Sequence, residues 1–310
     1  MRIVSLQPYL TDVLSSFGVE TQLVGISHKC IVSENPGRIV IVTEPAEDAT
    51  KAVDDDHERL AQGLALNSVK VSALIDARPD VIVTSCVDKD STSFISWAEP
   101  YLTRLCGKNV LIKSFSIERL TELYDTFEAL AILIGKGRLG RDLAQRTKAQ
   151  TQDWAKNFYD RLRNKKVTVL SSVKPLSLAT GLIPDLIQAI TGQPQVRTKE
   201  QLLAPLTWSE IVVFRPDVII VAPCGATLEE SLRSLKELEA APEWEDIPAV
   251  KRGEVIFYEG VELYQPGPQF IKGVAVMVSA VAGLDSGYIT KKDEFYRLRF
   301  VELHRHRFMC

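Results

Sequence analysis

The chain has 310 residues, 45% of them hydrophobic, which is enough for two domains with separate cores. Its 37 Lys and Arg residues nearly balance its 40 Asp and Glu residues. The net charge of −3 therefore argues against nucleic acid or an anionic membrane as a partner attracted by charge alone. The five cysteines are an odd number and are scattered, unlike a disulfide framework, so we expect reduced thiols.

The N-terminal segment has a short apolar run that is interrupted at Gln7 and Pro8. A secretory signal needs a longer apolar segment and a small-residue cleavage site. Together with reduced cysteines, this predicts a cytoplasmic protein. The alternative is a periplasmic or extracellular protein whose leader is not included in the sequence. No stretch approaches about twenty uninterrupted apolar residues, so no transmembrane segment is predicted.

The first quarter of the chain begins an alternation of strand and helix patterns. A short β-prone run, RIVSL at 2–6, precedes apolar residues at helical spacing in 11–18. The next predicted strand, QLVGIS at 22–27, is followed by HKC at 28–30. The acidic stretch 44–58 is predicted to be a solvated loop.

The alternation continues to residue 115. A predicted helix over 68–78 ends before Pro79, because the residue that precedes a proline is disfavoured in the α region. The β-branched run DVIVTS at 80–85 is typical of a parallel strand covered on both faces. A helix over 94–108 and a strand over 109–115 follow. Alternating strands and helices predict a parallel sheet with right-handed crossovers.

Residues 117–166 keep a helical pattern with no strand. Gly135, Gly137 and Gly140 within them match G-x-G-x-x-G, the dinucleotide-binding fingerprint. That fingerprint needs a strand before its first glycine, whereas an amphipathic helix precedes it here. We therefore interpret the motif as a helix break followed by a long linking helix.

The second half restarts the strand pattern with KVTVLSSV at 166–173 and continues with a helix over 183–192. Residues 206–225 then repeat the helix, proline stop and buried strand of the first half. A strand over 254–260 and a helix over 266–283 follow. The charged and aromatic remainder has no predicted role, and its His304 and His306 are predicted to be surface residues.

Two nearly identical segments, RPDVIVTSC at 78–86 and RPDVIIVAPC at 215–224, each end in a cysteine. They are predicted to be central strands of two separate sheets. The fold class is therefore α/β, with two Rossmann-like lobes and mostly parallel sheets. The predicted divisions are an N-terminal lobe (1–135), a linking helix (136–164), a C-terminal lobe (165–284) and a C-terminal extension (285–310).

Seven segments carry a family resemblance in chain order: RIVSLQPYLTDVLSSFG, LVGISHKC, RPDVIVTSC, LIGKGRLGRDLA, WSEIVVFRPDVIIVAPCG, IPAVKRGEVIFYEG and YQPGPQFIKGV. Together, over residues 2 to 284, they resemble the solute-binding proteins of ABC importers for vitamin B12 and iron siderophores, in particular the cobalamin-binding-protein-like branch. The resemblance implies a class III solute-binding fold, in which a rigid helix joins two lobes and a ligand lies in the cleft between them.

The same resemblance implies a small-molecule ligand, which would be a corrinoid or another metal chelate, and a permease of an ABC importer as partner. No cofactor is required. Pockets for vitamin B12 in this family have aromatic walls, and the candidate wall residues here are Tyr9, Phe94, Trp97, Phe115, Trp208 and Tyr264.

Polar residues follow the predicted strands where ligands bind in open α/β sheets, beyond the carboxyl ends. His28, Cys30 and Cys86 end strands of the first lobe, and Cys224 ends one of the second. Imidazole and thiolates suit Zn, Cu(I) or Co, so these four residues are candidate metal ligands. The alternative is structural, because free cysteine is often a buried small hydrophobe. Cys106, inside a predicted helix, is assigned to packing.

Further candidate ligand contacts lie beside the same strand ends. Pro8 and Tyr9 follow the first strand, and Tyr264 lies in a loop before the proline-rich helix start. Trp208, at the start of a helix, is either a packing anchor or a ligand contact.

Three functions follow from these residues. The first is a binding protein for a corrinoid or other metal chelate. The second is a metal-binding protein or metallochaperone that holds Zn or Co directly through the four cysteine and histidine residues. The third is an enzyme with a cysteine nucleophile, for which His28 would be the base, although no Asp or Asn is identifiable to orient it.

Overall fold

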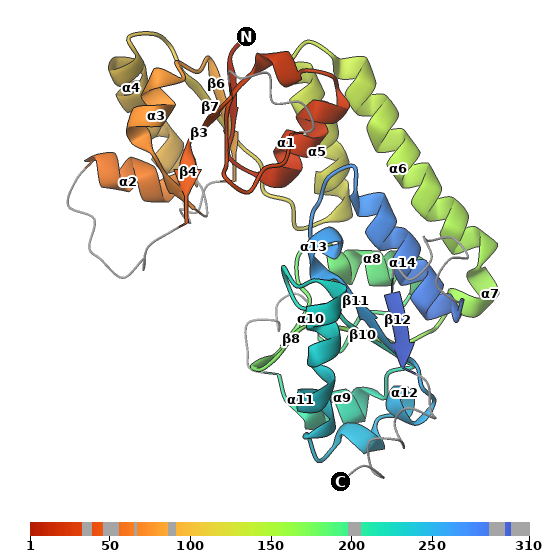
Figure 1. Ribbon diagram of the computed structural model, residues 1–310. Coiled ribbons are helices and arrows are strands. Elements are labelled where there is room, and N and C mark those ends of the chain that lie inside the picture. Colours follow the sequence, from red (N-terminus) through yellow and green to blue (C-terminus); the bar gives the residue numbers. More distant parts are fainter. Residues whose placement is uncertain are drawn as a thin grey trace. The chain divides into compact units, whose positions relative to one another are not determined.

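The computed structural model contains two compact units (Figure 1), and it describes residues 1–32, 39–45, 56–64, 67–85, 91–197, 206–284 and 295–298. Unit 1 comprises Met1–Ile117 and Glu122–Ala144, and unit 2 comprises Glu118–Thr121 and Gln145–Cys310. Helix α6 (Gly137–Asn157) contributes residues to both units. Within the described residues, none of the helices has both the length and the apolar character needed to cross a membrane.

Unit 1 is built on a parallel five-stranded sheet in the order β3-β2-β1-β6-β7. Its strands are β1 (Ile3–Ser5), β2 (Leu23–Ile26), β3 (Val40–Ile41), β6 (Val81–Thr84) and β7 (Leu111–Ser114). Along the chain, β1, β2 and β3 extend the sheet toward one edge, and β6 and β7 then extend it toward the other edge. The strand order therefore reverses between β1 and β6, which is where ligands bind in open α/β sheets.

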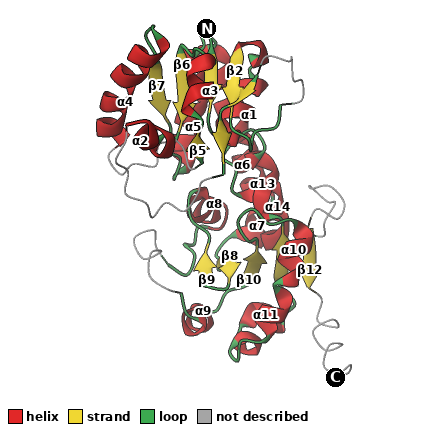
Figure 2. Ribbon diagram, turned by 60° about the vertical axis from the view of Figure 1, so that its left-hand side comes forward, coloured by secondary structure: helices red, strands yellow, loops and turns green. Residues whose placement is uncertain are grey.

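The helices of unit 1 cover this sheet, and Figure 2 shows them flanking the strands. They are α1 (Pro8–Ser16), α2 (Asp56–Gly63), α3 (Val71–Asp76), α4 (Ser91–Cys106), α5 (Leu120–Leu133) and the start of α6; a short 3-10 turn spans Glu20–Gln22. A separate antiparallel pair is formed by β4 (Thr43–Glu44) and β5 (Ser68–Val69). Every residue of β6 is buried, as expected for a parallel strand covered on both faces.

The acidic stretch is not entirely the loop that was predicted. Residues 46–55 lie outside the described residues, but α2 begins at Asp56. The helix forms because Leu60 and Leu64, spaced by one turn, are both fully buried in the core of unit 1.

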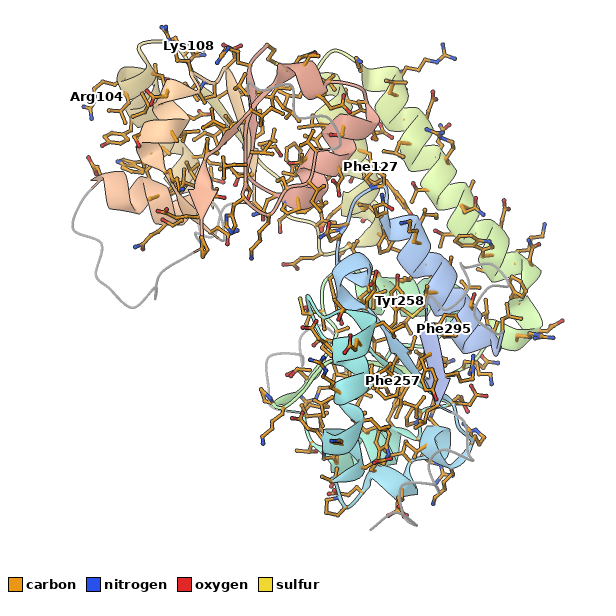
Figure 3. The ribbon with its side chains drawn as sticks, in the orientation of Figure 1. Arg104, Lys108, Phe127, Phe257, Tyr258 and Phe295 are labelled. Carbon is orange, nitrogen blue, oxygen red and sulfur yellow. The ribbon has the colours of Figure 1, made fainter. Side chains whose placement is uncertain are left out.

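The three-glycine motif is a junction between two helices, in agreement with its interpretation. Gly135 has φ +72° after α5, a conformation that glycine adopts at little cost. Gly140 lies inside α6, where an added Cβ would be 2.5 Å from both the Ala131 Cβ and the Phe127 carbonyl oxygen. Figure 3 labels Phe127 in this region. The motif therefore serves close helix packing.

Unit 2 has a mixed five-stranded sheet in the order β12-β11-β10-β8-β9. Its strands are β8 (Val167–Val173), β9 (Leu176–Leu178), β10 (Val218–Val221), β11 (Val255–Tyr258) and β12 (Phe295–Leu298). Strands β8, β10 and β11 are parallel, whereas β9 and β12 are antiparallel edges. Both sheets confirm the α/β class.

Strand β12 falls in the C-terminal extension, where no strand was predicted. Tyr258 pairs with Phe295, and both side chains are buried (Figure 3). The sequence does not indicate this strand, because its two end residues are buried and its two middle residues are partly buried, without the alternation of a half-buried strand. His304 and His306 lie outside the described residues.

The helices of unit 2 are α7 (Tyr159–Leu162), α8 (Leu182–Thr191), α9 (Trp208–Phe214), α10 (Leu228–Arg233), α11 (Leu235–Glu239), α12 (Pro248–Lys251), α13 (Gly260–Leu263) and α14 (Phe270–Ala282), with a 3-10 turn at Trp244–Asp246. Helix α14 is apolar around most of its circumference and is buried along most of its length, as expected for a helix in a core. It ends at Gly283, which has φ +70°.

We expect Gly140→Ala to lower the free energy of unfolding by about 1–3 kcal/mol, because the new methyl group meets backbone and a short side chain that cannot move aside. Gly137→Ala is the matched control from the same motif. Its nearest contact would be the movable Ile132 side chain at 3.3 Å. Urea unfolding of both variants checks the prediction, and equal midpoints would contradict it.

Candidate functional site

The predicted ligand residues that are described lie mostly beyond the carboxyl ends of the parallel strands of their own unit. In unit 1, Pro8 and Tyr9 follow β1, His28 and Cys30 follow β2, and Phe115 follows β7. In unit 2, Cys224 follows β10 and Tyr264 follows β11 and α13. Cys86, predicted as a further contact, lies outside the described residues. That the two edges serve one ligand stays a prediction.

Tyr9 links two strand ends of unit 1. Pro8 opens α1, since its fixed φ suits the first helical position. The Tyr9 hydroxyl then donates a hydrogen bond to the Phe115 carbonyl oxygen at 2.9 Å. Burial raises the pKa of Tyr9 to about 12, although a hydrogen bond to the Ser85 side chain opposes the shift. Tyr9 is therefore a neutral phenol, and its hydrogen bond joins the end of β1 to the end of β7 across the intervening strand β6.

Cys30 is held as a thiol. Its Sγ lies 3.1 Å from Thr11 Oγ1, and Thr11 Oγ1 also lies 2.8 Å from Ser5 Oγ. Burial raises the pKa of Cys30, and the hydrogen bonds from Thr11 and Ser27 only partly oppose this. Since the thiolate is the form that binds metals and attacks electrophiles, Cys30 is poorly suited to either role at neutral pH.

His28 is fixed by its neighbours on β2 and β4. Its backbone N–H donates to Thr43 Oγ1 at 2.9 Å, and the same oxygen lies 2.8 Å from its ring Nδ1. The Thr43 hydroxyl in turn donates to Ser27 Oγ at 3.0 Å. Ser27 and Thr43 are buried, whereas His28 is partly exposed. Sequence reasoning missed Ser27 and Thr43, because only the fold brings Thr43 beside the end of β2.

The edge of unit 2 is built around the turn after β10. The Cys224 N–H donates to the Ser171 carbonyl oxygen at 3.1 Å, and the side chain of Cys224 is exposed. The Tyr264 hydroxyl donates to the Ala222 carbonyl oxygen at 2.9 Å, and burial raises its pKa. Gly260 allows this packing, because an added Cβ would lie 1.8 Å from the Pro223 carbonyl oxygen. Tyr264 thus braces the turn that presents Cys224.

Trp208 packs against the core of unit 2, and its role as a ligand contact stays a prediction. Its ring meets the buried Trp244 edge-on, with centroids 5.8 Å apart. In Figures 1 and 2, α9, which starts at Trp208, lies at the opposite end of the unit 2 sheet from α13. Since α13 follows the carboxyl end of β11, α9 lies toward the amino ends of the strands.

Two other candidate aromatic residues also have packing roles, both on α4. Phe94 is 1% exposed in the core of unit 1. Trp97 stacks on Tyr101, with centroids 5.3 Å apart, and the Arg59 guanidinium lies 4.3 Å from its ring. Cys106 is buried at the end of α4, in agreement with its assignment to packing.

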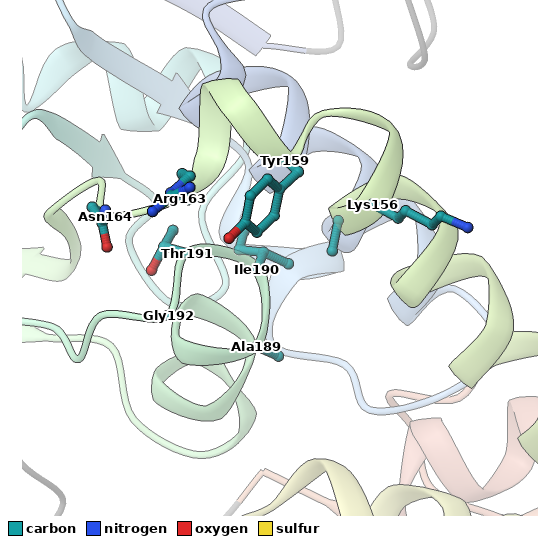
Figure 4. Close-up of a pocket in the computed structure, with 9 residues that line it drawn as sticks. Lys156, Tyr159, Arg163, Asn164, Ala189, Ile190, Thr191 and Gly192 are labelled. Carbon is teal, nitrogen blue, oxygen red and sulfur yellow. The ribbon is translucent and has the colours of Figure 1, made fainter.

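Unit 2 also has a pocket of about 400 Å³ at the ends of α6 and α8 (Figure 4). Tyr159, Arg163 and Lys156 line it, together with Ile190 and Thr191. Its lining extends to Asn164, three residues before β8, so the pocket lies toward the amino ends of the parallel strands. It contains none of the predicted ligand residues.

The two described edge cysteines are expected to differ in reactivity. Iodoacetamide at pH 7 should modify the exposed Cys224 at least about tenfold faster than Cys30, whose raised pKa keeps it a thiol. Peptide-resolved mass spectrometry measures each site in the same sample, and the rate at Cys30 should keep rising as the pH is raised above 8. Equal rates at pH 7 would show that Cys30 is an activated thiolate.

We expect Tyr264→Phe to lower the free energy of unfolding by about 1 kcal/mol, since it leaves the Ala222 carbonyl oxygen without its partner. Tyr159→Phe, at a position that is 53% exposed in the same unit, is the control and should have little effect. Thermal or urea unfolding distinguishes the two, and an unchanged midpoint for Tyr264→Phe would refute the bracing role.

Solved structures of periplasmic binding proteins share this fold. A possible iron-binding, periplasmic solute-binding protein from Staphylococcus epidermidis has 18% identity and a TM-score of 0.65, covering 90% of this chain and 98% of its own. IsdE of S. aureus, complexed with heme, has 16% identity and a TM-score of 0.64 (90% and 98%). The vitamin B12-binding protein BtuF of Vibrio cholerae has 16% identity and a TM-score of 0.60 (90% and 96%). No curated protein matches the chain.

The sequence model of one family, described as periplasmic binding protein, matches residues 3–261 and so extends over most of the chain. This finding overturns the predicted cytoplasmic location, because the members of this family are periplasmic or extracellular. The family comprises solute-binding proteins and not enzymes, which confirms the prediction that the chain is not an enzyme. The chain belongs to the periplasmic binding protein family and has its class III solute-binding fold.

Proposed function

We propose that this protein binds a metal chelate and delivers it to the permease of an ABC importer. The observation that carries the proposal is the family match over residues 3–261, which extends across both units. Structures that share the fold belong to proteins named for vitamin B12, heme and iron. Within this class we favour a metal–tetrapyrrole, such as a corrinoid.

The chemistry of the strand ends supports a chelate over a bare ion. Of the predicted metal ligands, Cys30 is kept protonated by burial. His28 is partly exposed, and its hydrogen bonds with Thr43 fix the orientation of its ring. A bare Zn or Co ion typically takes several protein ligands, and thiolates are among the best. A chelate already supplies most ligands, so it needs fewer from the protein.

We propose ligand contacts for each unit separately. In unit 1 they are Pro8, Tyr9, His28, Cys30 and Phe115, beside the reversal of strand order where ligands bind in such sheets. In unit 2 they are Cys224 and Tyr264. Tyr9 and Tyr264 contribute apolar ring surface, since each hydroxyl is already bonded to a carbonyl oxygen of its own unit.

The test is a titration of the purified protein with cyanocobalamin, hemin and a ferric siderophore, followed by visible absorption and calorimetry. We expect saturable one-to-one binding of at least one chelate, with metal-free protoporphyrin IX as a weaker-binding control. Elemental analysis of the protein as purified tests the metallochaperone alternative. Stoichiometric Zn or Co with no bound tetrapyrrole, or no binding of any of the three chelates, would refute the proposal.

A further inference from the structure

The surroundings of His28 point to a specific task, which rests on the proposed function. We propose that His28 Nε2 binds the metal of the chelate as an axial ligand, and that Thr43 and Ser27 are positioning residues that hold the imidazole in the tautomer this requires.

The hydrogen bonds around Thr43 determine that tautomer. The Thr43 hydroxyl has one proton, and it donates this proton to Ser27 Oγ at 3.0 Å. The two lone pairs of Thr43 Oγ1 then accept from the His28 backbone N–H at 2.9 Å and from ring Nδ1 at 2.8 Å. Nδ1 therefore carries the proton, and Nε2 keeps the lone pair that a metal needs.

This arrangement is the one that metal-binding histidines use in proteins. The ring nitrogen that does not bind the metal donates a hydrogen bond to a fixed acceptor, which sets the orientation of the ring and the basicity of the other nitrogen. Thr43 is 1% exposed and Ser27 is fully buried, so the acceptor is anchored from inside the unit. Among the described residues, none bonds Nε2.

The surface beside His28 suits the face of a macrocycle. Ile31, three residues further along the chain, is 87% exposed, and Val40 and Ile41 on the neighbouring β3 are 40% and 43% exposed. These three belong to a small set of large apolar side chains that the described residues leave in contact with solvent. Successive residues of a strand face opposite sides of its sheet, so an apolar ring system bound beside His28 would cover at most one of Val40 and Ile41 together with Ile31.

One imidazole is sufficient for a tetrapyrrole, because four equatorial positions of the metal are filled by the ring and only axial positions remain. The polar groups of the other candidate ligands at this edge of unit 1 already have hydrogen-bond partners. The thiol of Cys30 is bonded to Thr11, and the hydroxyl of Tyr9 is bonded to the Phe115 carbonyl oxygen.

The experiment compares wild-type protein with His28→Ala, Thr43→Val and Cys30→Ser, each titrated with hemin and with diaquocobinamide. We expect both wild-type complexes to show the absorption spectrum of a nitrogen-ligated metal, and the ferric hemin complex to show the corresponding electron paramagnetic resonance spectrum. His28→Ala should lose this signature, and added imidazole should restore it. Thr43→Val keeps the shape of the side chain but removes the acceptor, and should weaken binding about tenfold or more. Cys30→Ser tests the neighbouring thiol as the alternative metal ligand. Tyr159→Phe, titrated in the same way, is the control that should keep the wild-type spectrum, because Tyr159 is exposed and is not among the proposed ligand contacts.

The outcomes separate the two proposals. Chelate binding by His28→Ala with the wild-type spectrum overturns the axial role and leaves the proposed function intact. Loss of the signature in Cys30→Ser, with His28→Ala unchanged, overturns it in favour of the thiol. Wild-type protein that binds neither probe overturns this role, whereas the proposed function is overturned only if cyanocobalamin and the ferric siderophore are not bound either. Imidazole rescue of His28→Ala shows that the variant is folded.

Discussion

Burial of one parallel strand on both of its faces is the constraint on which each unit depends. All four residues of β6 in unit 1 and of β10 in unit 2 are buried, because helices cover both sides of the sheet. Such strands accept few polar side chains along their length, and in β6 the one polar residue is Thr84 at its end. Polar chemistry is therefore confined to the strand ends, and His28, Cys30 and Cys224 all occur just after a strand.

The sequence was sufficient to predict what depends on local pattern. The buried runs that became β6 and β10 and the proline stops before them are local signals, and they gave the α/β class. What depends on tertiary contacts was missed. Strand β12 forms because β11 offers it a partner, and Trp208 is a packing residue because Trp244 lies against it. The partnership of His28 with Thr43 joins residues fifteen apart along the chain.

Two neighbouring candidates at one strand end differ in chemistry because their surroundings differ. Cys30 and His28 are two residues apart, and a sequence pattern treats both as soft metal ligands. Burial keeps the thiol of Cys30 protonated, although its hydrogen bond with Thr11 partly opposes this, whereas Thr43 accepts the imidazole proton of His28 and frees the other ring nitrogen. The burial of Cys30 and the hydrogen bond between His28 and Thr43 therefore decide which side chain is available, and neither is visible in the sequence.

Strand β12 has a consequence for how the chain is made. It pairs with β11 along all four residues, from Val255 with Leu298 to Tyr258 with Phe295, and it is the last described strand. During synthesis β11 leaves the ribosome about forty residues earlier, at rates of roughly 5–20 residues per second. For that interval one side of β11 is an open edge with unpaired backbone groups, the kind of edge that recruits other chains. The nascent protein is therefore exposed to aggregation along this edge until β12 is complete.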